Sequence, residues 1–159
     1  MPGFKYTFLM RTAKYLSYKN NGLRLLYILS RWVLHHFQIK YGINIPYNTV
    51  IGSGLYIGHY GGIVVNHEAK IGRNCNINHE VTIGATYGGK HPGIPTIGDH
   101  VYFGPGSKVI GGINIGNYVA IGANSVVTTD IPNNAVVIGN PAKIISLNGS
   151  TNYIVNTDW

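Results

Sequence analysis

The sequence predicts an all-β solenoid with a short helical segment at its N-terminus, and a six-residue period is the main evidence. From residue 97 to 127 a large apolar residue returns at every sixth position, and the residue four places later is small or β-branched. The large residues are Ile97, Phe103, Val109, Ile115, Ile121 and Val127, and the paired ones are Val101, Ser107, Ile113, Val119, Ser125 and Ile131. This period fits neither a helix nor an alternating strand. Each short face therefore contributes one inward side chain, and the coils bury their apolar rows by stacking.

Composition supports this fold class. The chain has 159 residues, enough for one domain, with 22 glycines and only 11% charged residues. A solenoid needs glycines at its corners, and the glycines here lack the three-residue period of collagen. Cys75 is the single cysteine, which favours a reducing compartment. Its spacing from Ile71 indicates a small buried side chain. We recognise no secretory signal and no membrane span, so we expect a cytoplasmic protein.

The N-terminal segment, residues 1–42, carries the basic character of the chain. It holds seven Lys and Arg residues and no acid, whereas the remainder balances five cations against five acids. Such a segment suits an anionic membrane surface or an acidic partner. No nucleic-acid-binding motif accompanies it, so nucleic acid is not expected as a partner.

Helix is predicted over residues 8–38, with a break at residues 19–22. The second half has an apolar stripe at helical spacing, made of Leu25, Leu29, Trp32, Val33 and Phe37. Two interpretations stay open, and they are compatible. The stripe packs on the end of the solenoid and caps it, or the helix lies on the inner face of an anionic membrane.

The solenoid is predicted over residues 43–145, followed by a polar tail, 146–159. Its apolar register begins as Ile45, Ile51, Ile57 and Ile63, slips by two residues, and resumes as Ile71, Ile77 and Ile83. Fourteen residues then separate Ile83 from Ile97. The excess, rich in Gly and Pro, predicts an extruded loop over residues 84–96. A break in a regular repeat is where a functional loop is expected.

Three of the seven histidines are candidates for chemistry, since imidazole takes up protons readily near neutral pH. His59 stands among glycines two residues after Ile57, His79 holds the equivalent place one coil later, and His91 lies in the extruded loop. We expect the loop to meet residues 57–62 at one edge and bring two imidazoles together. The others are assigned differently: His35 and His36 to the helix, His100 to a structural corner, and His67 to neither group.

Other chemistries have no support in the sequence. No paired-Cys or His-x-x-x-His pattern predicts a metal site. A Gly-x-Ser-x-Gly elbow is absent. With five acids in the whole chain, a carboxylate pair for glycoside hydrolysis is not expected.

Residues 44–145 resemble the hexapeptide-repeat acyltransferases, and within them the serine acetyltransferase branch. Five blocks in order carry the resemblance: Gly58–Val65, Val81–Gly84, Lys90–Ile94, Ile121–Val127 and Gly139–Lys143. The resemblance implies a left-handed parallel β-helix, acetyl-CoA as co-substrate without a metal, and a homotrimer with active sites between subunits.

The resemblance also implies residue roles. His59 matches the general base, His91 a second active-site histidine, and Asn44 the position that orients the base. We place Gly58, Lys90 and His79 on the acceptor side. The positions matching the family's CoA site are Gly104, Pro105, Ala123, Thr128, Thr129 and Lys143.

Three departures from the serine acetyltransferase pattern concern the acceptor. Gly58 and Asn44 each replace an Asp, and Lys90 replaces an Arg. A zwitterionic amino acid needs both of its charges met, so we favour a neutral hydroxyl, such as a sugar of a surface polysaccharide. In its short basic N-terminus the chain resembles capsular and exopolysaccharide O-acetyltransferases. The alternatives are serine O-acetylation for cysteine biosynthesis and a non-catalytic β-helix scaffold.

Overall fold

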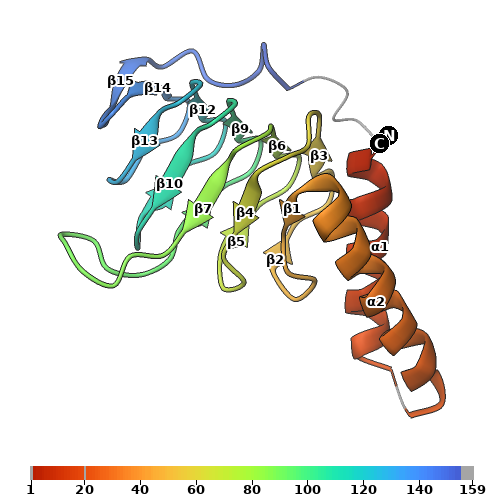
Figure 1. The fold of residues 1–159 in the computed structure, drawn as a ribbon. Coiled ribbons are helices and arrows are strands. Elements are labelled where there is room, and N and C mark those ends of the chain that lie inside the picture. The colour runs from red at the N-terminus through yellow and green to blue at the C-terminus, as the bar shows by residue number, and fades with distance from the viewer. Residues whose placement is uncertain (1, 20, 155–159) are drawn as a thin grey trace.

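The computed structural model describes residues 2–19 and 21–154, and shows a three-sided stack of short strands with two helices at one end (Figure 1). Sheet A contains β1 (Ile43–Asn44), β4 (Ile63–Val65), β7 (Thr82–Gly84), β10 (Lys108–Ile110) and β13 (Val126–Val127). Sheet B contains β2 (Val50–Ile51), β5 (Lys70–Ile71), β8 (Thr96–Ile97) and β11 (Asn114–Ile115). Sheet C contains β3 (Tyr56–Ile57), β6 (Asn76–Ile77), β9 (Tyr102–Phe103), β12 (Ala120–Ile121), β14 (Val136–Gly139) and β15 (Ala142–Ser146).

Strands pair in parallel with the strand one coil further along the chain. In sheet C, for example, Ile77 is in register with Ile57 on one side and with Phe103 on the other. From β1 to β13, strands that follow one another in sequence thus lie in different sheets, and every third strand is a hydrogen-bonded neighbour. This coil-on-coil pairing agrees with the predicted solenoid.

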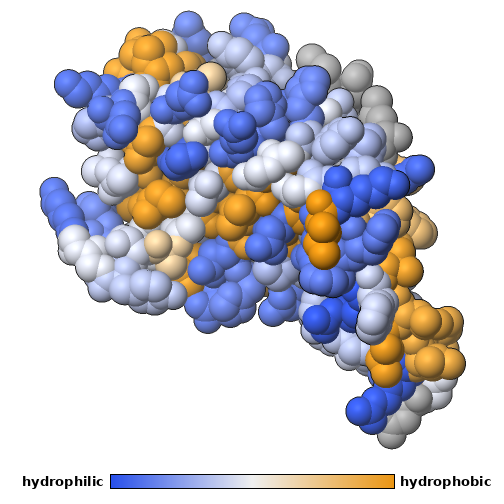
Figure 2. Space-filling view, viewed as in Figure 1, coloured by the Kyte–Doolittle hydropathy of each residue, from blue (hydrophilic) through white to orange (hydrophobic). Residues whose placement is uncertain are grey.

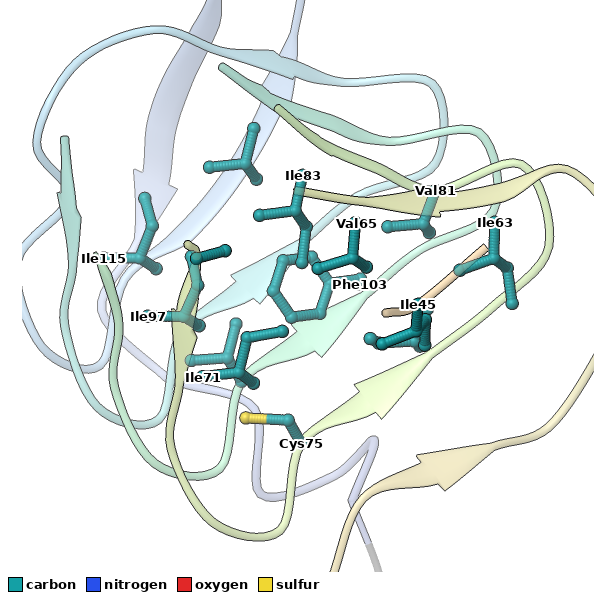
Figure 3. Close-up of a cluster of buried hydrophobic side chains, with 14 of the residues drawn as sticks. Ile45, Ile63, Val65, Ile71, Cys75, Val81, Ile83, Ile97, Phe103 and Ile115 are labelled. Atoms are coloured by element: carbon teal, nitrogen blue, oxygen red, sulfur yellow. The ribbon is translucent and has the colours of Figure 1, made fainter. Parts of the chain in front are cut away.

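The core is the stack of inward side chains between the three sheets (Figure 3). All twelve residues of the predicted rows between positions 97 and 131 are at most 5% exposed. Cys75 is buried beside them, and burial raises the pKa of its thiol to about 12. The six-residue period therefore identified the core positions correctly.

One part of the predicted register was wrong. The two-residue slip was expected between Ile63 and Ile71, but the pairing places it earlier. Val65, not Ile63, is in register with Ile83. Eight residues thus separate Ile57 from Val65, whereas six separate the equivalent residues at this corner in later coils. The error arose because Ile63 and Val65 are both buried, so hydrophobicity alone does not distinguish them.

The loop between β7 and β8 stands away from the stack (Figure 1). Its base is closed by an antiparallel bridge between Thr86 and Gly93. The two backbone N···O distances of this bridge are 3.0 and 2.8 Å.

Helix α1 (Pro2–Ser17) closes the first end of the solenoid. The Tyr6 hydroxyl is buried and donates a hydrogen bond of 2.7 Å to the carbonyl oxygen of Ile45. Gly3 lies so close to Ile57 that a Cβ on this glycine would come within 2.4 Å of the Ile57 carbonyl oxygen. The contact of α1 with the first coil thus depends on the missing side chain at position 3.

Helix α2 (Arg24–Tyr41) follows a 3₁₀ turn (Asn21–Leu23), close to the predicted break. Of its predicted apolar stripe, Phe37 packs against the core, but the stripe as a whole does not cover the end of the solenoid. Leu25 and Trp32 of the stripe are 68% and 76% exposed, and the buried residue of α2 is Leu34. The reason is that α1 already covers the end of the solenoid, and α2 packs beside α1 through its other side.

At the opposite end β15 turns back and pairs antiparallel with β14. The following segment lies along sheet C, where the Tyr153 ring stacks on Tyr102 with 4.9 Å between ring centres. Of the predicted tail, residues 155–159 lie outside the described part of the chain.

Candidate active site

A column of equivalent corner positions joins sheet C to sheet A. His59 follows β3 by two residues, and His79, Pro105 and Ala123 follow β6, β9 and β12 in the same way. The rings of His59 and His79 meet edge to face, with 6.0 Å between their centres and 87° between their planes. The structure therefore brings these two predicted histidines together at the surface.

The corner that carries His59 is the one with two extra residues. Within it Gly61 and Gly62 adopt φ values of +110° and +66°, which side chains with a Cβ rarely allow. The same corner has two residues fewer in later coils, so the insertion makes the corner that carries His59 wider than those above it. His59 is consequently exposed, while His79 is half-buried.

Glu80 is a neighbour of this corner that the sequence did not suggest. Its backbone N–H donates a 2.7 Å hydrogen bond to the carbonyl oxygen of Gly61. A Cβ placed on Gly62 would lie 3.1 Å from Cγ of Glu80, so the side chain runs beside that glycine. The sequence could have pointed to Glu80 through its position directly after His79, one coil above the widened corner. Glu80 supplies a carboxylate in a region that otherwise has little charge.

His91 lies at the other edge of sheet A. Its loop leaves after β7 and, with the neighbouring strand ends, encloses a pocket of 310 Å³. The pocket is lined by Thr86, Gly88, Gly89, Lys90, His91, Ile110, Thr128 and Thr129. The expected meeting of this loop with residues 57–62 in one chain was therefore wrong. A six-residue face of sheet A separates the two corners, ~20 Å at about 3.3 Å per residue.

The backbone of His91 is held on the solenoid by a glycine pair. The N–H of Gly112 donates a 2.9 Å hydrogen bond to the His91 carbonyl oxygen. A Cβ on Gly112 would come within 2.5 Å of the Pro92 carbonyl oxygen, and Gly111 has a φ of +104°. The loop can lie this close only because both positions lack a side chain.

The predicted CoA residues divide between the two edges. Gly104, Pro105 and Ala123 stack above His79 on the first corner, where the N–H of Gly106 donates to the His79 carbonyl oxygen at 3.0 Å. Thr128 and Thr129 face the His91 loop. Lys143 is on β15, in register with Ile138 and exposed.

Asn44 is on β1, in register with Val64. Within the described part of the chain its amide makes no hydrogen bond to His59. The expected orienting contact between these two residues is thus not formed in this structure.

Of the remaining histidines, His67 follows β4 at the loop edge of sheet A, and the others lie outside this sheet. His100 stacks on Tyr118, with 4.5 Å between ring centres and 5° between planes, which confirms its structural role. His35, His36 and His67 are exposed. Across residues 2–19 and 21–154, no three potential ligands converge on a metal site. Neither described helix has the length and hydrophobicity needed to cross a bilayer.

Residues 94–129 match the family model described as bacterial transferase hexapeptide (six repeats). A serine acetyltransferase of Mycobacterium tuberculosis is 40% identical over 120 residues, which are 74% of this chain and 52% of that protein. A serine acetyltransferase of Helicobacter pylori is 38% identical over 123 residues, 77% of this chain and 72% of that protein.

Solved structures agree with these sequence relatives. The crystal structure of serine acetyltransferase from Brucella abortus has a TM-score of 0.79 and 31% identity, covering 94% of this chain and 59% of that one. A serine acetyltransferase in complex with CoA has a TM-score of 0.75 and 30% identity, covering 91% and 57%. The chain thus spans little more than half the length of most of these relatives. It belongs to the serine acetyltransferase family of hexapeptide-repeat transferases.

Proposed function

We propose that this chain is an acetyl-CoA-dependent O-acetyltransferase, with serine as the leading acceptor. The observation that carries the proposal is His59, exposed on a widened corner beside His79 in a chain 38–40% identical to serine acetyltransferases. By the same likeness the coils wind left-handed. A cytoplasmic location suits the reaction and the single reduced cysteine, Cys75.

In this mechanism His59 is the general base. Its free ring nitrogen takes the proton of the acceptor hydroxyl as that oxygen attacks the thioester carbonyl of acetyl-CoA. The new carbon–oxygen bond forms, the carbon–sulfur bond breaks, and the proton passes from His59 to the departing CoA thiolate. His79, in edge-to-face contact with His59, keeps the ring upright at the corner.

A complete site needs more than one subunit. His59 and the His91 pocket lie at opposite edges of sheet A, so one chain cannot direct both at the same thioester. In a homotrimer with parallel solenoids, the His59 corner of one subunit faces the loop edge of the next. Lys90, Thr128 and Thr129 of one subunit then face His59 of the next across the groove between them.

The proposed choice of acceptor rests on the charge near His59. Gly58 and Asn44 lack the carboxylates expected of a site for an amino acid, which favoured a sugar hydroxyl. Glu80 alters that argument, since its carboxylate stands at the same corner and can pair with an ammonium group. Together with relatives that are serine acetyltransferases, it supports serine as the leading candidate. A sugar hydroxyl in surface polysaccharide synthesis is the second candidate, supported by Gly58 and Asn44.

The test is acetyl-CoA consumption with serine and with a panel of sugars. His59→Ala is expected to lower kcat by about 10²–10⁴-fold, the usual contribution of a general base. His36→Ala is the matched control, because it removes an exposed histidine that lies on α2, outside sheet A. Undiminished turnover in His59→Ala would assign the base to His79 or His91.

Glu80→Gln separates the two acceptors. If Glu80 binds the serine ammonium, the substitution raises KM for serine about tenfold or more and leaves KM for acetyl-CoA unchanged. Turnover on sugars alone, with no effect of Glu80→Gln, would make the sugar hydroxyl the acceptor. Sedimentation equilibrium measures the trimer, and an active monomer would exclude the shared site.

A further inference from the structure

The outer face of α2 is apolar and uncovered. Leu25, Leu29, Trp32 and Ile39 are between 52% and 76% exposed, and their spacing puts them on one side of the helix. Leu34, 2% exposed, is on the opposite side, against α1 and the solenoid. The helix thus has two apolar sides, and only one of them is used within the subunit.

Helix α1 adds a second exposed row. Phe4, Phe8 and Tyr15 are each at least 60% exposed, and the first two rings are stacked with 6.3 Å between their centres. Figure 2 shows apolar surface gathered over the projecting helices, with hydrophilic groups around it. We call α1, the 3₁₀ turn and α2 together the helical hairpin.

The charge of the hairpin has one sign. Residues 1–42 contain seven cations and no acid, and the rest of the chain sums to zero. Arg24, Arg31 and Lys40 of α2 are exposed, as is Lys19 before it. The net charge of +7 therefore sits entirely on the element that also carries the exposed apolar face.

We propose that the helical hairpin binds the surface of an anionic phospholipid membrane, with the outer face of α2 in the interface. Apolar side chains flanked by Lys and Arg are the composition of helices that lie in such an interface. A second copy of this chain is the less suitable occupant. Two hairpins with seven cations each and no acid would repel one another across a shared interface.

A pocket beside this face strengthens the choice of a phospholipid. It has a volume of 710 Å³ and lies between α2 and the first coil, with Arg31, Trp32, His35 and Tyr47 in its lining. The Arg31 guanidinium stands 4.6 Å from the centre of the Tyr47 ring and donates to the Tyr27 hydroxyl at 3.0 Å. A cation fixed next to the apolar face suits a headgroup phosphate.

The test uses vesicles with and without an anionic lipid. In a Trp159→Phe background, Trp32 is the single tryptophan and reports its own environment. The full chain is mixed with phosphatidylglycerol–phosphatidylcholine vesicles or with phosphatidylcholine alone, at low and high salt. We expect co-sedimentation and a blue shift of Trp32 fluorescence with the anionic vesicles, both weakened by salt.

Matched substitutions locate the surface. Leu25→Glu with Leu29→Glu is expected to lower the partition coefficient at least tenfold, whereas Leu147→Glu, an equally exposed leucine outside the hairpin, leaves it unchanged. Lys19→Gln with Arg24→Gln is expected to lower it about fivefold for each charge. Lys70→Gln, an exposed cation on sheet B, is the control. Circular dichroism verifies the fold of every variant.

Three results would overturn the proposal. One is no binding to anionic vesicles at low salt, and another is unchanged binding by the Leu25 and Leu29 variant. The third is a lipid-free oligomer that Leu29→Glu dissociates, which would make a second copy the occupant. The proposal does not rest on acyl transfer. Vesicle binding by a protein without turnover would refute the proposed function and leave the docking surface standing.

Discussion

Two buried serines at the same position of successive coils are expected to respond oppositely to alanine. Ser107 and Ser125 are both 0% exposed and stand two residues before the buried valines Val109 and Val127. The Ser125 hydroxyl oxygen accepts a 3.1 Å hydrogen bond from the N–H of Gly139. The Ser107 hydroxyl has no partner within the described part of the chain.

The sign of each effect follows from that difference. A hydroxyl buried without a partner costs about 1–3 kcal/mol, so Ser107→Ala is expected to raise the free energy of unfolding by about 1–2 kcal/mol. Ser125→Ala loses a hydrogen bond with a net value of about 1 kcal/mol, and unfolding becomes easier by that amount. For a chain of this size each kcal/mol shifts Tm by about 2–4 °C.

Urea and thermal unfolding of both variants test this, at one protein concentration because assembly affects apparent stability. Thr49→Val is expected to raise the free energy of unfolding as Ser107→Ala does, since the Thr49 hydroxyl is also buried without a partner in the described part of the chain. A lower Tm for Ser107→Ala, or shifts of the same sign for both serines, would refute the reasoning.

Three further predictions concern the loop, the cysteine and the ion pair. Gly112→Ala, whose Cβ would reach within 2.5 Å of the Pro92 carbonyl oxygen, displaces the extruded loop. In steady-state assays we expect kcat/KM to fall about 10²-fold, and unchanged kinetics would contradict this. Since burial raises the pKa of Cys75 to about 12, a maleimide at pH 8 should label the thiol only after unfolding in urea, and rapid labelling of the folded protein would be inconsistent. The backbone N–H and then the guanidinium of Arg73 lower the pKa of Asp99. The stability this adds is present above the unfolded pKa of about 3.9 and is lost as pH falls through the lower folded value. Asp99→Asn should therefore make the free energy of unfolding, measured in urea, fall less steeply at acid pH. An unchanged pH dependence would exclude a role for the pair.

Much of the solenoid could be predicted because each inward position faces the same environment in every coil. Phe103 and Ile121 occupy one column, and the stack admits a large apolar residue there whatever the neighbouring corners do. The period fails where two inward positions lie close together. Ile63 and Val65 are both buried, and only strand pairing shows which of them continues the column.

The candidate site was predicted in its parts but not in its arrangement. The flanking glycines singled out His59, and spacing identified the loop that carries His91. Spacing does not tell which edge of a sheet a loop leaves, so the two were expected to meet. Glu80 was not predicted because its position matters only in relation to the coil below, where the carbonyl oxygen of Gly61 accepts a hydrogen bond from the Glu80 backbone N–H. The apolar stripe of α2 was predicted, but a stripe does not name its partner, so packing on the solenoid and contact with a membrane both stayed open.

The antiparallel return of β15 on β14 has a consequence for assembly. A stack of parallel coils ends in strands whose unpaired N–H and C=O groups offer a template for another chain. In sheet C the last parallel strand, β14, is already occupied by a strand of opposite direction. An incoming coil of a second molecule cannot extend sheet C in the repeating parallel register, and at the first end of the solenoid it would meet α1. The reversal and the helix therefore act as terminators that favour discrete particles over end-to-end fibres.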